Sequence, residues 1–167
     1  MKVEHTIEIN APAETVWDVT ADINNWPDWT PTVEKAARQD DGPFRIGSHA
    51  RMQQPGMPEV IWTVIEMEEG KSFAWETHMR GIRFTATHYT LPTETGCTKT
   101  LGLELKSVLA FLLWPLAKRR ALKTLETENK GLKEFCEAKA LTLPIHNPHS
   151  PKPCTSGAIV RCRTNIK

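Results

Sequence analysis

The chain has 167 residues, of which 40% are hydrophobic and 25% charged, as in an ordinary globular domain. This length suits one domain, which would bury roughly 70% of the surface of its unfolded chain. The formal net charge of +1 argues against a nucleic-acid partner, because nucleic-acid binders carry a basic face or a high pI.

Targeting and redox signals are sparse. Lys2, Glu4 and His5 interrupt the residues after Met1, so no signal peptide is predicted. The longest apolar run, 108–114, is far shorter than the ~20 residues that span a bilayer. The cysteines are widely spaced and form no CxxC pair, which favours reduced thiols and a cytoplasmic protein. They are Cys97, Cys136, Cys154 and Cys162.

The N-terminal segment predicts a strand followed by two short helices. Residues 3–10 alternate apolar and polar side chains, as a half-buried strand does. Pro12 then suits a first helical turn, and Glu14 would face the positive end of the helix dipole. Trp26 and Trp29 follow in a segment stiffened by a proline.

Three short strands are expected next. Residues 32–38 and 46–53 favour strands and are separated by a turn cluster around Gly42. Met52 belongs to the more apolar side of the second of these strands. Residues 60–67 are also typical of a strand, but both of its faces are partly apolar, so either face could point inward.

A hairpin is predicted around a tight turn at Arg80-Gly81. Because side chains alternate along a strand, one face of this hairpin collects its apolar residues. That face comprises Phe73, Trp75, Thr77, Met79, Ile82, Phe84, Ala86 and His88.

One more strand and a long helix complete the pattern. The strand follows a turn at 95–96, and its predicted inward residues are Leu101, Leu103 and Leu105. From Ser107 to Ala140 apolar residues recur at helical spacing, with charged residues around them. A helix of this length would reach about 50 Å, enough to cross a whole sheet.

The order of one strand, two short helices, six strands and one long helix resembles the SRPBCC superfamily, the START-like or helix-grip fold, in its polyketide cyclase/dehydrase-like branch. The runs WTVIEMEEGKSFAWE and GCTKTLGLEL also look like strands of this family. The resemblance covers residue 3 to about 140. It implies an α+β fold, in which a curved antiparallel sheet of about seven strands wraps around the C-terminal helix. Residues 1–140 would form one START-like ligand-binding domain.

Residues 141–167 depart from this family, whose members usually end with the helix. Four prolines and no apolar period predict a disordered or extraneous tail. The histidines and cysteines of this tail match no structural zinc spacing, so no metal is expected. They are His146, His149, Cys154 and Cys162.

The resemblance also implies a hollow between sheet and helix that binds a small hydrophobic or aromatic molecule, without a cofactor. The candidate lining residues are Trp75, Thr77, Met79, Phe84, Ala86 and His88 from the hairpin, Met52, Leu103 and Leu105 from other strands, and Leu113 and Leu116 from the helix. Trp26 and Trp29 are placed near its mouth. The alternative is that these side chains simply fill a solid core.

His88 is the candidate catalytic residue, because it is the only ionisable group on the apolar face of the hairpin. Near neutral pH it could act as a general acid or base, or orient a ligand hydroxyl or carbonyl. Burial would favour its uncharged form. The alternative role is a histidine at the edge of the core, satisfied by one hydrogen bond.

Three function classes therefore stay open. The first is a binding protein for a small apolar molecule, and the second is an aromatase/cyclase-type enzyme that uses His88. The third is a protein-interaction or membrane-surface module, in which the apolar run 111–116 precedes a basic segment. The cations of that segment are Lys118, Arg119, Arg120 and Lys123. No hydrolase, kinase or dehydrogenase motif is present, and nothing indicates an oligomeric state.

Overall fold

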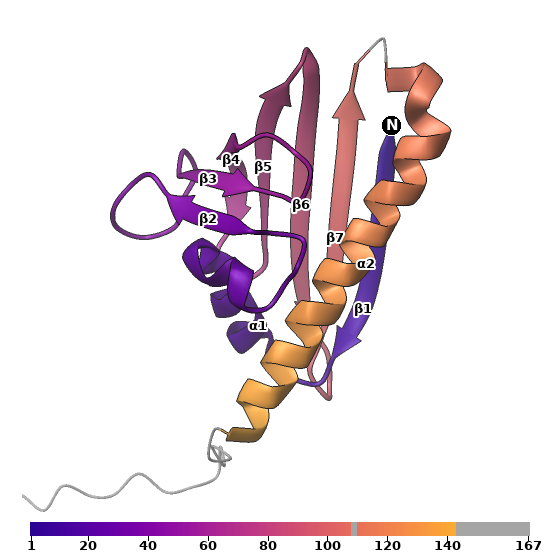
Figure 1. Cartoon of the computed structure of the whole chain (residues 1–167). Helices are drawn as coiled ribbons and strands as arrows, with labels where there is room; N and C mark the ends of the chain where they lie inside the picture. Colours follow the sequence, from indigo (N-terminus) through magenta and orange to yellow (C-terminus); the bar gives the residue numbers. More distant parts are fainter. Residues whose placement is uncertain (108–109, 143–167) are drawn as a thin grey trace, which may run out of the picture.

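The computed structural model describes residues 1–107 and 110–142 (Figure 1). Its elements are β1 (Lys2–Ile9), α1 (Ala13–Ala21), the 3₁₀ helix η1 (Ile23–Asp28), β2 (Lys35–Arg38), β3 (His49–Gln53), β4 (Val60–Glu68), β5 (Ser72–Met79), β6 (Ile82–Pro92), β7 (Cys97–Lys106) and α2 (Ala110–Thr142). The order confirms the predicted series of one strand, two short helices, six strands and one long helix. Within the described ranges, no helix has the length and hydropathy needed to cross a membrane.

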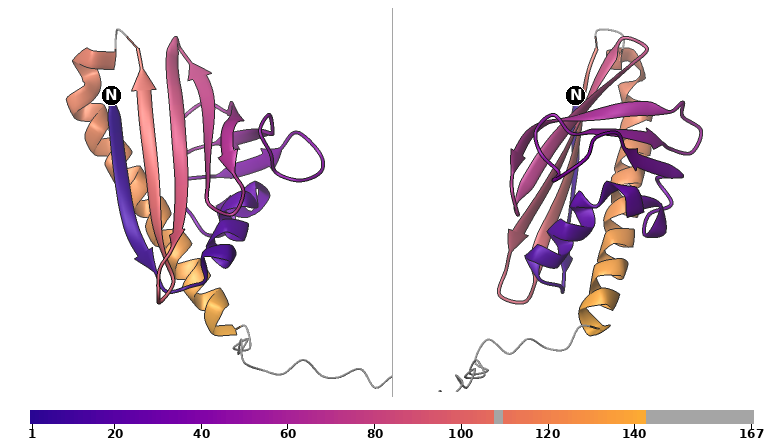
Figure 2. Two further views of the ribbon diagram at one scale, coloured as in Figure 1. Left: turned by 180° about the vertical axis from the view of Figure 1, so that it is seen from behind. Right: turned by 90° about the vertical axis from the view of Figure 1, so that its left-hand side faces the viewer.

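The seven strands form one antiparallel sheet in the order β1-β7-β6-β5-β4-β3-β2. The sheet curves, and α2 runs diagonally along it with α1 and η1 on the same side (Figures 1 and 2). Helix α2 contacts β1 most extensively and also touches β7 and α1. These features confirm the α+β helix-grip fold.

The β5–β6 hairpin has the predicted register. Phe73 lies opposite His88, and Trp75 lies opposite Ala86. The two turn residues, Arg80 and Gly81, have φ values of 51° and 74°, the left-handed geometry of a type I′ turn. A two-residue turn keeps both strands in phase, so the apolar face of the hairpin points toward α2.

The two faces of β4 differ in exposure, and a β-bulge then changes the alternation of its side chains. Trp62 and Val64 are buried, whereas Ile61 and Ile65 on the other face are 50% and 39% exposed. The pairing with β5 then shifts between Val64 and Glu66. The extra residue reverses the alternation, so that Met67 pairs with inward-facing Phe73 and packs on the core.

Helix α1 begins one residue later than expected. Pro12 has ψ 137° and occupies the N-cap position rather than the first helical turn. Its carbonyl still accepts a hydrogen bond of 3.1 Å from the Val16 amide. The helix buries Val16 and Trp17 against the sheet, where Trp17 meets Phe73 edge to face.

Helix α2 has 33 residues and is therefore about 50 Å long. Its buried residues recur at helical spacing and include Leu125, Glu128, Asn129, Leu132 and Cys136. The helix ends at Thr142, so residues 141 and 142 continue it rather than starting the predicted tail. Residues 143–167, including the four histidines and cysteines named above, lie outside the described part of the chain.

Candidate ligand-binding site

A cavity of about 440 Å³ lies between the inner face of the sheet and α2. This volume falls within the range of pockets that bind small molecules. Aromatic and aliphatic side chains supply most of the wall, including Trp26, Met52, Val60, Trp62, Trp75, Met79, Phe84, Ala86, Leu101, Leu103 and Leu105. The curved sheet and the helix therefore leave an apolar hollow between them.

Most of the predicted lining residues meet at this cavity. They are Trp26, Met52, Trp75, Thr77, Met79, Phe84, Ala86, His88, Leu103 and Leu105. The side chains of Leu113 and Leu116, the two residues predicted from the helix, lie outside the described residues. That these residues bind a ligand stays a prediction, but their common position on one wall is a property of the structure.

The tryptophan pair does not stand at the mouth of the cavity as expected. Trp26 is almost fully buried, lies 5.2 Å from Trp75 between ring centroids, and forms part of the cavity wall. Its indole Nε1 donates a hydrogen bond of 3.0 Å to the Thr20 carbonyl, which fixes the ring.

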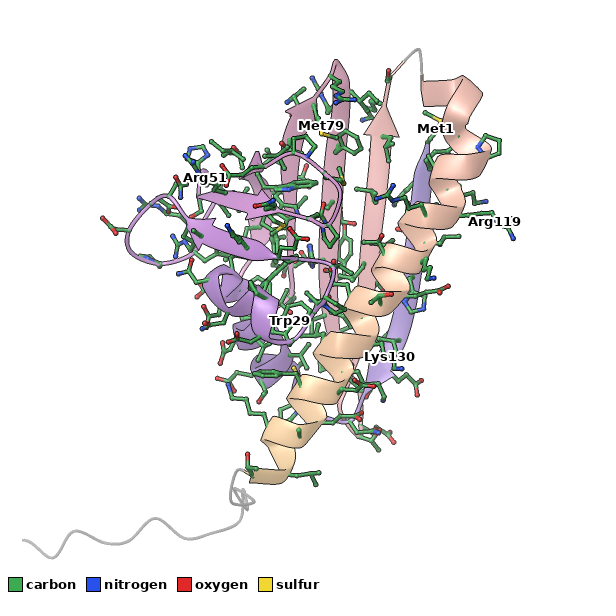
Figure 3. The ribbon with its side chains drawn as sticks, in the orientation of Figure 1. Met1, Trp29, Arg51, Met79, Arg119 and Lys130 are labelled. Atoms are coloured by element: carbon green, nitrogen blue, oxygen red, sulfur yellow. The ribbon has the colours of Figure 1, made fainter. Side chains whose placement is uncertain are left out.

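Trp29 lies outside the cavity lining. Its ring packs beside Trp26 at 5.4 Å between centroids. Its backbone carbonyl comes so close to Gly131 that a side chain there would overlap it. Trp29 therefore fills the junction between η1 and α2, next to the helix (Figure 3).

His88 is enclosed by aromatic rings at the buried side of the cavity. Its ring stacks on Phe73, with 4.4 Å between centroids and 9° between planes, and Trp26 and Trp75 lie within 6 Å. Its Nδ1 has no hydrogen-bond partner among the described residues. Burial, and secondarily the charge of Lys99, hold the pKa of His88 well below its usual value, so the ring is neutral at pH 7.

Lys99 places a cation in the core behind this wall. It is fully buried, and its Nζ donates hydrogen bonds of 3.1 Å to the hydroxyls of Thr20 and Thr90. Burial lowers the pKa of Lys99 to about 8, although the Glu128 carboxylate opposes this change. The two hydroxyls thus supply hydrogen bonds to the buried ammonium group, while Glu128 acts on it only through its charge.

Glu128 is the acidic residue of the cavity wall. It is 7% exposed, and its carboxylate has no hydrogen bond or close ion pair with any other described residue. Burial raises the pKa of Glu128 to about 7, and the charge of Lys99 limits the rise. At neutral pH this group is therefore divided between a hydrogen-bond donor form and a charged acceptor form.

The sequence contained signals for the polar residues that the prediction missed. Lys99 has the same strand parity as Leu101, so alternation alone places it inward. Glu128 lies three residues after Leu125 and four before Leu132, on the buried stripe of the helix. The inward direction of Trp62 is not evident from the sequence, because both faces of β4 carry apolar residues.

Solvent-exposed residues line the cavity at Pro31, on α2 and in the β3–β4 loop, and this exposed part of the lining is its opening. Gln54, Pro55 and Met57 of this loop line it on one side. Arg120 lines it from α2, and its Nη2 lies 3.8 Å from where a Cβ at Gly56 would be. The described ranges hold no group of three histidine, cysteine or acidic residues arranged to bind a metal ion.

Comparisons with known proteins agree with this architecture. A START superfamily protein from Mycobacterium smegmatis superposes with a TM-score of 0.68 at 23% identity, covering 83% of this chain and 98% of that one. The di-domain ARO/CYC StfQ from the steffimycin biosynthetic pathway gives 0.68 at 12% identity, covering 83% of this chain and 51% of that one.

Norcoclaurine synthase from Thalictrum flavum, in complex with dopamine and hydroxybenzaldehyde, gives a TM-score of 0.60 at 18% identity, covering 81% and 85% of the two chains. At these identities the similarity shows the fold alone. No curated protein matches the chain. The family model described as polyketide cyclase / dehydrase and lipid transport matches residues 1–137. The chain therefore belongs to this family, and its fold is the START-like helix-grip fold.

Proposed function

We propose that this protein binds a small hydrophobic or aromatic molecule in the cavity between the sheet and α2. The observation that carries the proposal is the cavity itself, which is about 440 Å³ in volume and mainly apolar. Affinity would come from apolar area removed from water, at about 25 cal/mol per Å² before the costs of association.

Three residues of the same wall also carry polar atoms without a partner in the described part of the chain, which would suit a ligand that carries an oxygen or nitrogen. The indole Nε1 groups of Trp62 and Trp75 and the Nδ1 of His88 are buried without a hydrogen-bond partner among the described residues. An unpaired buried polar group costs about 1–3 kcal/mol, so a ligand that engaged one of them would recover part of this cost. A carbonyl or hydroxyl on an aromatic body suits such a wall.

Native mass spectrometry of the protein purified from its own host tests the proposal. The expected result is a bound small molecule, present in the wild-type protein and lost from Ala86→Trp, whose new ring would occupy the cavity. Tyr89→Trp is the matched control, because Tyr89 lies on the same strand but is exposed on the outer face of the sheet. Equal retention of the molecule by all three proteins would place it outside the cavity and contradict the proposal.

An aromatase/cyclase-type enzyme is the second candidate function. It is favoured by a specific observation, the neutral imidazole of His88, a lining residue of the cavity whose ring nitrogens form no hydrogen bond with other described residues. A neutral imidazole can accept a proton from a ligand carbon or hydroxyl and return it to another atom. The di-domain ARO/CYC StfQ shares this fold.

Substitution of His88 by glutamine separates the two candidates. A binding protein needs only the shape of the wall, so His88→Gln would weaken binding by a few-fold at most. An enzyme would retain ligand binding but lose turnover by about 10²-fold or more. Turnover that persists in His88→Gln would exclude the histidine from the chemistry.

A protein-interaction or membrane-surface role finds less support. Of the apolar run 111–116, the described side chains are Trp114 and Pro115. Trp114 is half-buried and packs against the small core cluster formed by Val3, Leu101 and Leu125. Vesicle co-sedimentation at low salt tests the membrane version, and binding to anionic liposomes would revive it.

A further inference from the structure

Two cationic side chains of α2 line the cavity and have no acidic partner among the described residues. Arg120 and Lys123 both line the cavity and are exposed to solvent. Within the described residues, neither side chain forms an ion pair or a hydrogen bond. Two charges one turn apart thus face the same opening with their donors free.

The arrangement contrasts with the next turns of the same helix. Lys130 and Lys133 each pair with a glutamate four residues later, at 3.8 Å and 2.6 Å. The equivalent partners of Arg120 and Lys123 are threonines. Thr124 and Thr127 donate their hydroxyls to the backbone carbonyls of Arg120 and Lys123, and both threonines line the cavity.

The charges of the cavity wall are therefore separated along the helix. Arg120 stands at the opening, against the β3–β4 loop at Gly56. Glu128 lies two turns farther along α2 and is buried. An anionic group taken deep into the cavity would lose its water and meet this carboxylate, whereas one at the opening would meet two cations and stay hydrated.

We infer that the ligand is an amphipathic anion, with its acidic group held by Arg120 and Lys123 and its apolar body inside the cavity. This inference rests on the proposed binding function and specifies the chemistry of the ligand. The acidic group is a carboxylate, sulfonate or phosphate, which free guanidinium and ammonium donors recognise by charge-assisted hydrogen bonds.

Two dyes with the same aromatic body provide a direct test. 8-Anilinonaphthalene-1-sulfonate carries the anion and N-phenyl-1-naphthylamine lacks it. Fluorescence titration of the full chain should give tighter binding of the sulfonate. Arg120→Gln combined with Lys123→Gln should weaken binding of the sulfonate dye by about tenfold. The same double variant should change the affinity for the neutral dye by less than about twofold.

Lys118 and Arg119 supply the matched control. Both are exposed on the same helix, neither lines the cavity, and Arg119 projects from the side of α2 opposite β3 and β4 (Figure 3). Lys118→Gln combined with Arg119→Gln removes the same charge and should leave the sulfonate affinity within about twofold of wild type.

The outcomes separate the two proposals. If neither dye binds the wild-type protein, or if Ala86→Trp binds both as well as wild type, the proposed function fails. If the neutral dye binds in the cavity but the sulfonate gains nothing from Arg120 and Lys123, only the inference about the anion fails. An equal loss in the control pair would mean that net charge, rather than these two residues, attracts the anion, and would also overturn it.

Discussion

The imidazole of His88 lies flat on the ring of Phe73, with 4.4 Å between centroids and 9° between planes. The two residues are direct partners across the β5–β6 pair, so the register of the hairpin creates the stack. The stack seals the imidazole from water on one face, while the Trp75 ring meets it edge to face. A histidine in this position behaves as a neutral aromatic wall whose buried Nδ1 has no hydrogen-bond partner among the described residues.

The neutral state of His88 predicts a loss of stability in acid. The unfolded chain takes up a proton on this residue near pH 6.5, whereas the folded protein, in which the pKa is well below that value, does not. Stability is therefore complete above about pH 6.5 and decreases as the pH falls below it, by at most about 1.4 kcal/mol per pH unit.

Urea unfolding of the wild-type protein and His88→Gln between pH 7 and pH 5 measures this effect. As the pH falls, the wild-type protein should lose more unfolding free energy than His88→Gln. A difference that is independent of pH would show that the folded protein accommodates the imidazolium, contrary to the buried position of the ring.

Because of the buried Glu128, we expect a second effect of pH on stability, opposite in direction to that of His88. Its pKa is about 7 in the folded protein and near 4.3 in the unfolded chain, so the folded state binds more protons between these values. The stability that protonation supplies is complete below about pH 4.3 and is lost as the pH rises to about 7. At pH 8, Glu128→Gln should be more stable than wild type by on the order of 1–3 kcal/mol.

Glu126→Gln is the control for this variant, because Glu126 lies on the same helix but is exposed. Urea unfolding at pH 5 and pH 8 should show no change of this kind for the control. A Glu128→Gln protein that is less stable than wild type at pH 8 would show that the ionised carboxylate is needed to compensate Lys99, and that the pair stabilises the fold.

At Gly131, replacement of glycine by alanine is expected to destabilise the protein, which is the opposite of its usual effect in a helix. Alanine normally stabilises a helix relative to glycine by about 1 kcal/mol. Here a Cβ would overlap the backbone oxygen of Trp29, so η1 would have to move away from α2. Gly131→Ala should therefore lower the free energy of unfolding by about 1–3 kcal/mol.

The neighbouring substitution Lys130→Ala separates this clash from a general effect on the helix. Lys130 is exposed and has only a long ion pair with Glu134. Its replacement should change the thermal midpoint little, whereas Gly131→Ala should lower it clearly. A stabilised Gly131→Ala protein would show that η1 and α2 are not in the close contact described.

The sequence predicted the fold well because its strongest signals are local. The alternation around the Arg80-Gly81 turn determines which side chains of β5 and β6 point inward, and a two-residue turn leaves no freedom in the register. The helical period of α2 and the order of the elements then leave few ways to cover one face of an antiparallel sheet.

The site was predicted less completely because it depends on contacts between distant segments. The position of Trp29 follows from the close approach of η1 to Gly131, which no local pattern reports. The inward direction of Trp62 is hidden because Ile61 and Ile65, on the exposed face of β4, are also apolar. Lys99 follows the alternation of β7, but a buried lysine becomes plausible only once Thr20 and Thr90 are seen to hold it.

Binding of the neutral dye N-phenyl-1-naphthylamine to wild type, Ala86→Trp and Tyr89→Trp tests the apolar cavity most directly. Wild type and Tyr89→Trp should bind one dye molecule with similar affinity, and Ala86→Trp should lose at least tenfold while remaining folded. Undiminished binding by a folded Ala86→Trp protein would mean that the hollow between the sheet and α2 does not receive the ligand.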